Sequence, residues 1–172
     1  MKTVLLGYMG SGKSTVAKLL ADSLNLPFTD LDDYIELKEQ KSIKSLFEDK
    51  GEIYFRLKEG HYLKEVLEDT SPGIIALGGG TPCYGNNMEL IKKSSKSFYL
   101  KGSIATISQR LSKEKSQRPL IAALNDEQLT EFIAKHLFER RAFYEQAGST
   151  INIDGKTANE LCDELILELK PA

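Results

Sequence analysis

The sequence predicts an α/β fold: a three-layer sandwich in which one parallel sheet of five strands lies between two layers of helices. Short apolar, β-prone runs alternate along the chain with longer segments whose apolar residues recur at helical spacing. The run 74–77 is apolar throughout, as expected for a strand buried on both faces of a sheet. Right-handed crossovers would place helices on both faces of such a sheet.

The whole chain, residues 1–172, has the length of a single domain with a sizeable core. The expected strands are 3–6, 28–33, 74–77, 97–100 and 150–153. The expected helices are one that ends near residue 25, two or three within 34–68, a short one at 88–91, and others at 104–111, 126–146 and 158–169. The helices after the second strand are more than a simple crossover needs, so we expect a substrate-binding insertion at about 32–68.

A glycine-rich loop at 7–15 separates the first strand from the first helix. Its sequence fits the phosphate-binding pattern G-x-x-x-x-G-K-[ST], and strand, loop and helix are the context that this pattern requires. The glycines allow backbone N–H groups to point at phosphate oxygens near the positive end of a helix. Lys13 would reach the β and γ phosphates, and the Ser14 hydroxyl would bind Mg²⁺. The expected nucleotide-binding residues here are Gly10, Ser11, Gly12, Lys13, Ser14 and Thr15.

Three carboxylates follow the second predicted strand: Asp30, Asp32 and Asp33. Ligands gather at the carboxyl ends of strands in open α/β sheets, so these acids are candidates for a metal or substrate site. Asp30 and Asp32 would face the same side of an extended backbone. Helix capping by Asp32 or Asp33 is an open alternative, because Asp is favoured at helix N-termini.

The next two features lie in the insertion and directly after the third strand. Arg56 and Glu59 stand at i and i+3, close enough to pair, although a surface ion pair worth less than about 1 kcal/mol is the plainer interpretation. The glycines 78–80 would let a ligand or another backbone approach closely. No acid ends the third strand, where many phosphate-loop enzymes hold Mg²⁺ indirectly. Asp30 is therefore the candidate for the outer shell of the metal.

The segment 112–124 is expected to be a lid. Its first part, 112–119, is polar and charged, which is typical of a mobile excursion from the core. Arg118 in this segment and Arg110 before it would bring positive charge over phosphates when the lid closes. A solvated loop without this role is equally open. Neighbouring arginines on the helix 126–146 point about 100° apart, so Arg140 and Arg141 would have different roles.

Composition and charge exclude several classes of protein. The net charge of −2 shows no global basic field of the kind that binds nucleic acid. No segment approaches the length of a membrane span, and the two cysteines, Cys83 and Cys162, have no metal-ligand spacing. Free thiols favour a reducing cytoplasm. We expect a cytoplasmic monomer that binds neither nucleic acid nor membrane.

The motifs together resemble the shikimate kinases over nearly the whole chain. They occur in order: the loop 7–15, Asp30-Leu31-Asp32, Phe55-Arg56 with Glu59, the three glycines 78–80, Arg118-Pro119-Leu120, and Arg141 within Arg-Ala-Phe-Tyr. The phosphate-binding loop alone is shared by many nucleotide hydrolases and kinases, whereas the combination is much more specific. The resemblance implies the phosphate-loop kinase fold with strand order 2-3-1-4-5. It also implies transfer of the γ-phosphoryl group of ATP to the 3-hydroxyl of shikimate, with Mg²⁺, in aromatic amino-acid biosynthesis.

The resemblance also implies a role for individual residues. Lys13 and Arg118 would stabilise the transferred charge, Asp32 would bind the shikimate hydroxyls and accept the proton, and Arg110 would lie near the adenine. Ser14 would bind Mg²⁺ directly and Asp30 through water. The implied substrate-binding residues are Asp32, Arg56, Gly78, Gly79, Gly80, Arg141, Phe47 and Phe55, with Glu59 orienting Arg56. Guanidinium groups suit a carboxylate and Asp suits hydroxyls, so these roles agree with the chemistry of the residues.

Two departures and two alternatives accompany the resemblance. The family often has an arginine-bearing stretch near the adenine, where this chain has Asp-Gly-Lys-Thr-Ala at 154–158, so the preference for a nucleotide base stays open. Tyr8 replaces a frequent Phe.

A related kinase of another small hydroxy acid, such as gluconate, is the alternative enzyme, because paired arginines fit any small carboxylate. A nucleotide-dependent switch is the alternative from another class, but it would need neither the insertion nor a second arginine.

Overall fold

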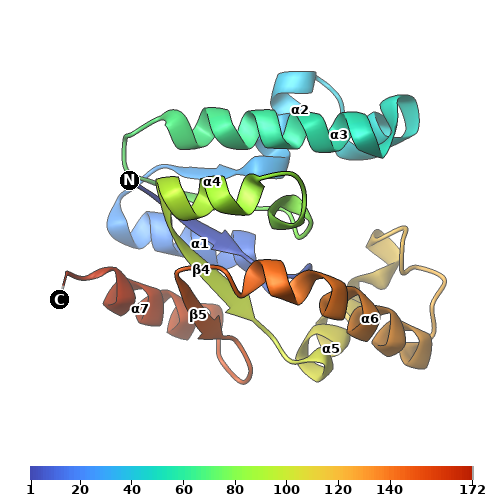
Figure 1. Ribbon diagram of the computed structural model, residues 1–172. Helices are drawn as coiled ribbons and strands as arrows, with labels where there is room; N and C mark the ends of the chain where they lie inside the picture. Colours follow the sequence, from blue (N-terminus) through green and yellow to red (C-terminus); the bar gives the residue numbers. More distant parts are fainter. Residues whose placement is uncertain (172) are drawn as a thin grey trace.

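Five parallel strands form one sheet in the computed structural model, which describes residues 1–171 (Figure 1). The strands are β1 (Lys2–Leu6), β2 (Phe28–Asp30), β3 (Gly73–Ala76), β4 (Ser95–Lys101) and β5 (Ser149–Asn152). Their spatial order is β2-β3-β1-β4-β5, and every neighbouring pair is parallel. The expected fold class and strand order are confirmed.

Helices cover both faces of this sheet (Figure 1). They are α1 (Lys13–Leu24), α2 (Leu31–Glu39), α3 (Ile43–Glu68), α4 (Asn87–Ser94), α5 (Ile104–Glu114), α6 (Asp126–Tyr144) and α7 (Ala158–Leu169), with short 3₁₀ turns at Thr81–Cys83 and Lys115–Gln117. α1 packs on α7 and against β3, whereas α4 packs on α3 and against β4. The chain crosses the sheet in one direction after β1 and in the opposite direction after β2 and β3. Because the crossovers are right-handed, the helices that follow these strands lie on opposite faces of the sheet.

The centre of the sheet is the best-buried part of the molecule. β1 is buried at every position, and Val4, Leu5 and Leu6 have no exposed surface. The β3 residues Ile74 and Ile75 are also buried, as a strand covered on both faces requires. Among residues 1–171, none of the helices combines the length and the apolar character that a membrane crossing needs.

The second strand is shorter than the sequence predicted. β2 ends at Asp30, and α2 begins at the next residue. Asp30 is itself the N-cap: its Oδ1 accepts hydrogen bonds from the backbone N–H groups of Asp32 (3.0 Å) and Asp33 (3.3 Å). Capping therefore occurs, but the residue responsible is neither Asp32 nor Asp33. Because Asp32 lies in a helix, the expectation that it continues an extended strand with Asp30 was wrong.

The insertion folds into α2 and the long helix α3, which Gly51 divides. Gly51 has φ 86° and ψ 172°, a conformation that is essentially restricted to glycine. The residues on either side of it are helical, so the chain kinks at this point and continues in a second helical segment. Gly51 therefore kinks the insertion without ending it.

The segment between α5 and α6 extends away from the sheet (Figure 1). α5 reaches Glu114, three residues beyond the predicted end at 111. Most of the segment is exposed or half-buried, as its polar composition indicates, but the Ile121 side chain has no exposed surface. Leu124 also packs against the core, so the segment is anchored at its far end by these two apolar residues.

We predict that Gly51→Ala destabilises the protein by about 1–3 kcal/mol, the cost of holding a residue with a Cβ in this conformation. No atom lies within 4 Å of a Cβ placed there, so backbone strain is the whole effect. Chemical denaturation measures the change, with the nearby exposed helical substitution Glu48→Ala as the control. Equal stability of the two variants would show that Gly51 can relax without strain.

Candidate active site

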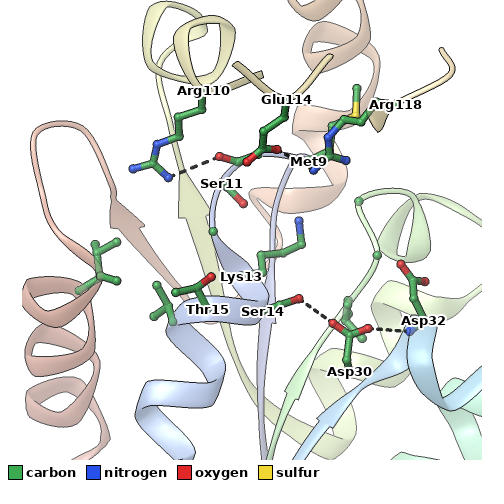
Figure 2. Close-up of a pocket in the computed structure, with 18 of the residues that line it drawn as sticks. Met9, Ser11, Lys13, Ser14, Thr15, Asp30, Asp32, Arg110, Glu114 and Arg118 are labelled. Atoms are coloured by element: carbon green, nitrogen blue, oxygen red, sulfur yellow. Dashed lines mark hydrogen bonds and ion pairs between the residues drawn. The ribbon is translucent and has the colours of Figure 1, made fainter. Parts of the chain in front are cut away.

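One cavity of about 560 Å³ lies at the carboxyl ends of β1, β2 and β3. Figure 2 shows Asp30 and Asp32 on one side of it, Arg110, Glu114 and Arg118 on the other, and Lys13 between them. The loop residues 9–15 form its floor. The remaining lining residues are Val16, Leu77, Gly78, Gly79, Lys113, Ala158 and Leu161.

The glycines of the loop allow it to pass through crowded space. Gly7, Gly10 and Gly12 have φ values of 147°, 78° and 86°. A Cβ on Gly7 would lie 2.7 Å from the Leu100 carbonyl oxygen, and one on Gly10 would lie 2.9 Å from the Leu111 side chain. Gly12 then caps α1, so the first free N–H groups of that helix face the cavity. The loop has the geometry of an anion-binding site.

The Lys13 ammonium group lies inside this loop. It donates a hydrogen bond to the Tyr8 carbonyl oxygen at 2.9 Å, and the residue is only 8% exposed. Burial lowers the pKa of Lys13 to about 8, while the nearby Asp32 carboxylate opposes the shift. A phosphate group would supply the opposite charge that this buried cation lacks.

Ser14 and Asp30 form a pair suited to a magnesium ion. The Ser14 hydroxyl donates to Asp30 Oδ2 at 2.6 Å, while Oδ1 of the same carboxylate caps α2 (Figure 2). Hydroxyl and carboxylate oxygens are hard ligands that fit Mg²⁺. No cluster of three or more His, Cys, Asp or Glu side chains able to hold a metal occurs within residues 1–171. Phosphate oxygens and water would therefore complete the coordination sphere.

Asp32 projects toward the glycines that follow β3. A Cβ on Gly78 would lie 3.0 Å from Asp32 Oδ1, so the carboxylate lies close to the backbone at this glycine. Burial, together with the carboxylates of Asp30 and Glu59, raises the pKa of Asp32 to about 6, against the opposing charge of Lys13. The group is thus a stronger base than an ordinary exposed carboxylate.

Glu59 is buried and Arg56 is half-buried, so the interpretation of this pair as a surface ion pair was wrong. Glu59 is 1% exposed, and its two oxygens accept from Arg56 Nη1 and from the Thr81 hydroxyl, both at 2.8 Å. The Arg56 guanidinium also lies over the Tyr84 ring, 4.1 Å from its centre. A Cβ on Gly80 would lie 2.7 Å from both terminal nitrogens of Arg56. Gly80 therefore permits the guanidinium group to approach the backbone.

The structure does not bring Arg141 into this group. Its side chain is 58% exposed and pairs with Glu145 at 3.4 Å. Arg140 instead faces the glycines: its Nη1 would lie 3.3 Å from a Cβ on Gly79. Adjacent residues of a helix point about 100° apart, so only one of the two arginines can face the site. The choice of Arg141 was wrong for this reason.

A signal for Arg140 was present in the sequence. Tyr144 follows it by one helical turn, and residues four apart share a face of a helix. Tyr144 is fully buried and its hydroxyl donates to the Gly79 carbonyl oxygen at 2.6 Å. The buried residues Ile133 and Leu137 continue the same face. Arg140 lies on this inward stripe, and Arg141 lies beside it.

The remaining expected residues lie at the ends of the site. Phe47 and Phe55 pack together with ring centres 4.7 Å apart; Phe55 is buried, and neither ring lines the cavity. Arg118 pairs with Glu114 at 3.2 Å, and Arg110 donates to the Gly10 carbonyl oxygen at 3.4 Å (Figure 2). Both arginines line the cavity, and both have carboxylate or carbonyl partners that phosphate oxygens could replace.

The stretch 154–158 contributes little side-chain functionality to the cavity. Asp154 accepts from the Ser103 backbone N–H at 3.0 Å, and Thr157 caps α7. Only Ala158 and the following Leu161 reach the cavity wall. An adenine ring there would meet an apolar surface and backbone groups.

Comparisons with known proteins agree with this arrangement. The family model for shikimate kinase matches residues 9–170. A shikimate kinase of Flavobacterium johnsoniae is 48% identical over 96% of this chain and 96% of its own length. The crystal structure of shikimate kinase from Bacteroides thetaiotaomicron superposes with a TM-score of 0.89 at 37% identity, over 98% of this chain and 99% of that chain. Shikimate kinase from Acinetobacter baumannii, solved in complex with shikimate, gives a TM-score of 0.85 at 33% identity, over 99% of this chain and 95% of that chain. The family indicated by the motifs is confirmed, and this chain belongs to the shikimate kinase family of phosphotransferases.

Proposed function

We propose that this protein transfers the γ-phosphoryl group of ATP to the 3-hydroxyl of shikimate. The observation that carries the proposal is the joint placement of a phosphate-binding loop and a pocket built for a small hydroxylated carboxylate. The loop supplies Lys13 and free helix N–H groups, and Asp32 lies in the same cavity wall. Beside that wall, the half-buried Arg140 and Arg56 lie against Gly79 and Gly80. No observation favours gluconate or another hydroxy acid as the acceptor.

The nucleotide end of the site would bind the phosphates of ATP. The backbone of the loop and Lys13 would hold the β and γ phosphates, and Arg118 would approach them by exchanging its Glu114 partner for phosphate oxygens. Arg110 would lie against the nucleotide at the cavity wall formed by Ala158 and Leu161.

The Ser14 and Asp30 pair fits magnesium, with Ser14 as a direct ligand and Asp30 bound through water. A bound Mg²⁺ would neutralise the charge that develops on the phosphates. Asp30 would also keep Ser14 oriented, because the hydroxyl and carboxylate are already 2.6 Å apart.

The acceptor end would hold shikimate by its carboxylate and hydroxyls. Arg56 and Arg140 would bind the carboxylate from two elements, while Gly79 and Gly80 allow the two guanidinium groups to lie close to the backbone. Phe47 and Phe55 would support Arg56 from the outer side. With both substrates held in line, the chemistry consists mainly of positioning and charge stabilisation.

Asp32 would accept the proton of the reacting hydroxyl. As that oxygen bonds to the γ phosphorus, the bond between this phosphorus and the β,γ-bridging oxygen breaks and ADP leaves. The proton passes to the Asp32 carboxylate, whose raised pKa makes it a better acceptor. We further propose that the enzyme acts as a monomer in the cytoplasm.

We predict that Arg140→Ala lowers kcat/KM for shikimate roughly 10–100-fold, since a charge-assisted hydrogen bond contributes about 1.5–3 kcal/mol. Arg141→Ala, its exposed neighbour, should change kcat/KM less than about twofold. Arg56 is a poorer choice for this test, because its removal leaves Glu59 buried without its ionic partner.

The methyl ester of shikimate makes this test specific for the carboxylate. Wild-type protein and the Arg141 variant should discriminate strongly against the ester, and the Arg140 variant much less. A larger loss from Arg141→Ala than from Arg140→Ala would contradict the assignment.

For magnesium, Asp30→Asn should raise the Mg²⁺ concentration for half-maximal rate about 10–100-fold, the usual effect of losing an outer-shell partner. Asn remains a good N-cap, so α2 should stay folded. Asp33→Asn, an exposed change in the same first turn, should leave the metal dependence as it is. If Asp30→Asn and Asp33→Asn reached half-maximal rate at the same Mg²⁺ concentration, the role of Asp30 would be refuted.

For the lid, amide hydrogen exchange in residues 112–124 should slow when a non-hydrolysable ATP analogue and shikimate bind together. Mass spectrometry of peptic fragments measures this, with the loop at 84–86 as an internal reference. Exchange that is equally fast in the free protein and in the ternary complex would leave only a solvated loop anchored by Ile121.

A further inference from the structure

The phosphate-binding loop is connected to α6 through the side chain of Tyr8. The Tyr8 hydroxyl lies 2.9 Å from His136 Nδ1, and the residue is 1% exposed. The two rings meet edge to face with centres 5.3 Å apart, and the Phe132 ring also packs edge to face on the imidazole at the same separation. The contact joins positions 128 residues apart in the chain.

The burial of the Tyr8 hydroxyl favours one arrangement of the protons in this pair. His136 Nδ1 is the only hydrogen-bond partner of the Tyr8 hydroxyl within residues 1–171, and a buried hydroxyl proton needs an acceptor. The neutral imidazole with its proton on Nε2 provides that acceptor. Burial and the Arg140 charge lower the pKa of His136, while Glu139 opposes them. Burial raises the pKa of Tyr8 to about 12, so both groups are neutral near pH 7.

Each partner also connects to a residue at one end of the active site. The Tyr8 carbonyl oxygen accepts from Lys13 Nζ at 2.9 Å and from the Ser11 N–H at 3.2 Å. On α6, Arg140 lies one turn after His136 and faces Gly79. The Tyr8–His136 contact therefore joins the loop that holds Lys13 to the helix that carries Arg140.

We propose that Tyr8 and His136 are positioning residues for phosphoryl transfer, and that their hydrogen bond sets the distance between the two ends of the active site. Lys13 would hold the phosphate donor and Arg140 the carboxylate of the acceptor, so movement between loop and helix would misalign the reacting atoms. The inference rests on the proposed function, because it assigns the donor and the acceptor to these two ends. The hydrogen bond acts on alignment, and neither side chain needs to touch a substrate.

Steady-state kinetics with ATP and shikimate test this positioning role. Tyr8→Phe and His136→Leu should each lower kcat about three- to tenfold, the range for loss of one hydrogen bond, while both KM values change less than about twofold. The double variant should be no slower than either single variant, since the two side chains form one interaction. His136→Asn should restore most of the rate, because its Oδ1 can take the place of Nδ1.

A matched substitution separates positioning from stability. Tyr62→Phe removes another buried hydroxyl, which bonds to Glu39 away from the cavity. It should lower the melting temperature about as much as Tyr8→Phe and leave kcat unchanged. Wild-type kcat in Tyr8→Phe and His136→Leu, measured below their melting temperatures, would overturn the proposal. A loss that the Asn variant does not restore, or additive losses in the double variant, would also overturn it.

Nitrogen NMR of the imidazole tests the hydrogen bond without a substrate. The chain has two histidines, so His61→Gln assigns the signals of His136. Wild-type protein should show an unprotonated Nδ1, and Tyr8→Phe should show a mixture of tautomers; a protonated Nδ1 in the wild type would overturn the assignment. If the wild-type protein failed to phosphorylate shikimate, the proposed function would be refuted. Failure of the positioning role alone would instead leave wild-type activity intact, so the two outcomes can be distinguished.

Discussion

The tight passage of the phosphate-binding loop through the centre of the molecule is the constraint on which the rest of the structure depends. The loop leaves the central strand β1 and must pass the Leu100 carbonyl of β4 and the Leu111 side chain of α5, at distances that only Gly7 and Gly10 permit. It ends at Gly12, which starts α1. A loop placed in this way determines where β4, α5 and α1 can lie, and every other part of the site is arranged around it.

The buried charges of the site are arranged for ligand binding rather than for stability. Glu59 is buried and orients Arg56, and a buried ion pair of this kind offsets its own desolvation cost at best. Burial likewise shifts the pKa of Lys13 down and that of Asp32 up, so each buried charge is costly in the protein alone. These costs are the usual consequence of holding charged groups ready for substrates, and the apolar strands of the sheet offset them.

The contacts of α6 show how one helix can serve both ends of the site. Its buried face carries Ile133 and Leu137 in the core, and the same stripe continues to Tyr144, which bonds to Gly79. His136 reaches Tyr8 from the neighbouring face. A rigid helix transmits position over several turns, whereas the segment before α6 has only Ile121 fully buried. The division between a well-packed helix and a loosely anchored segment suits the closing role proposed for residues 112–124.

The sequence by itself determined the fold class, the phosphate-binding loop and the family, because these depend on local patterns: alternating apolar segments, glycines at fixed spacing, and motifs in a given order. It also singled out Lys13, Ser14 and Asp30, which line the cavity, and Arg56, which lies against Gly80. The spacing of Ile133, Leu137 and Tyr144 already placed Arg140 on the apolar stripe of α6, but only the tertiary structure showed that this stripe meets the glycine turn at Gly79. The tertiary structure also decided that Glu59 is buried and that Tyr8 meets His136, since burial and contacts between distant segments arise only when helices pack on the sheet.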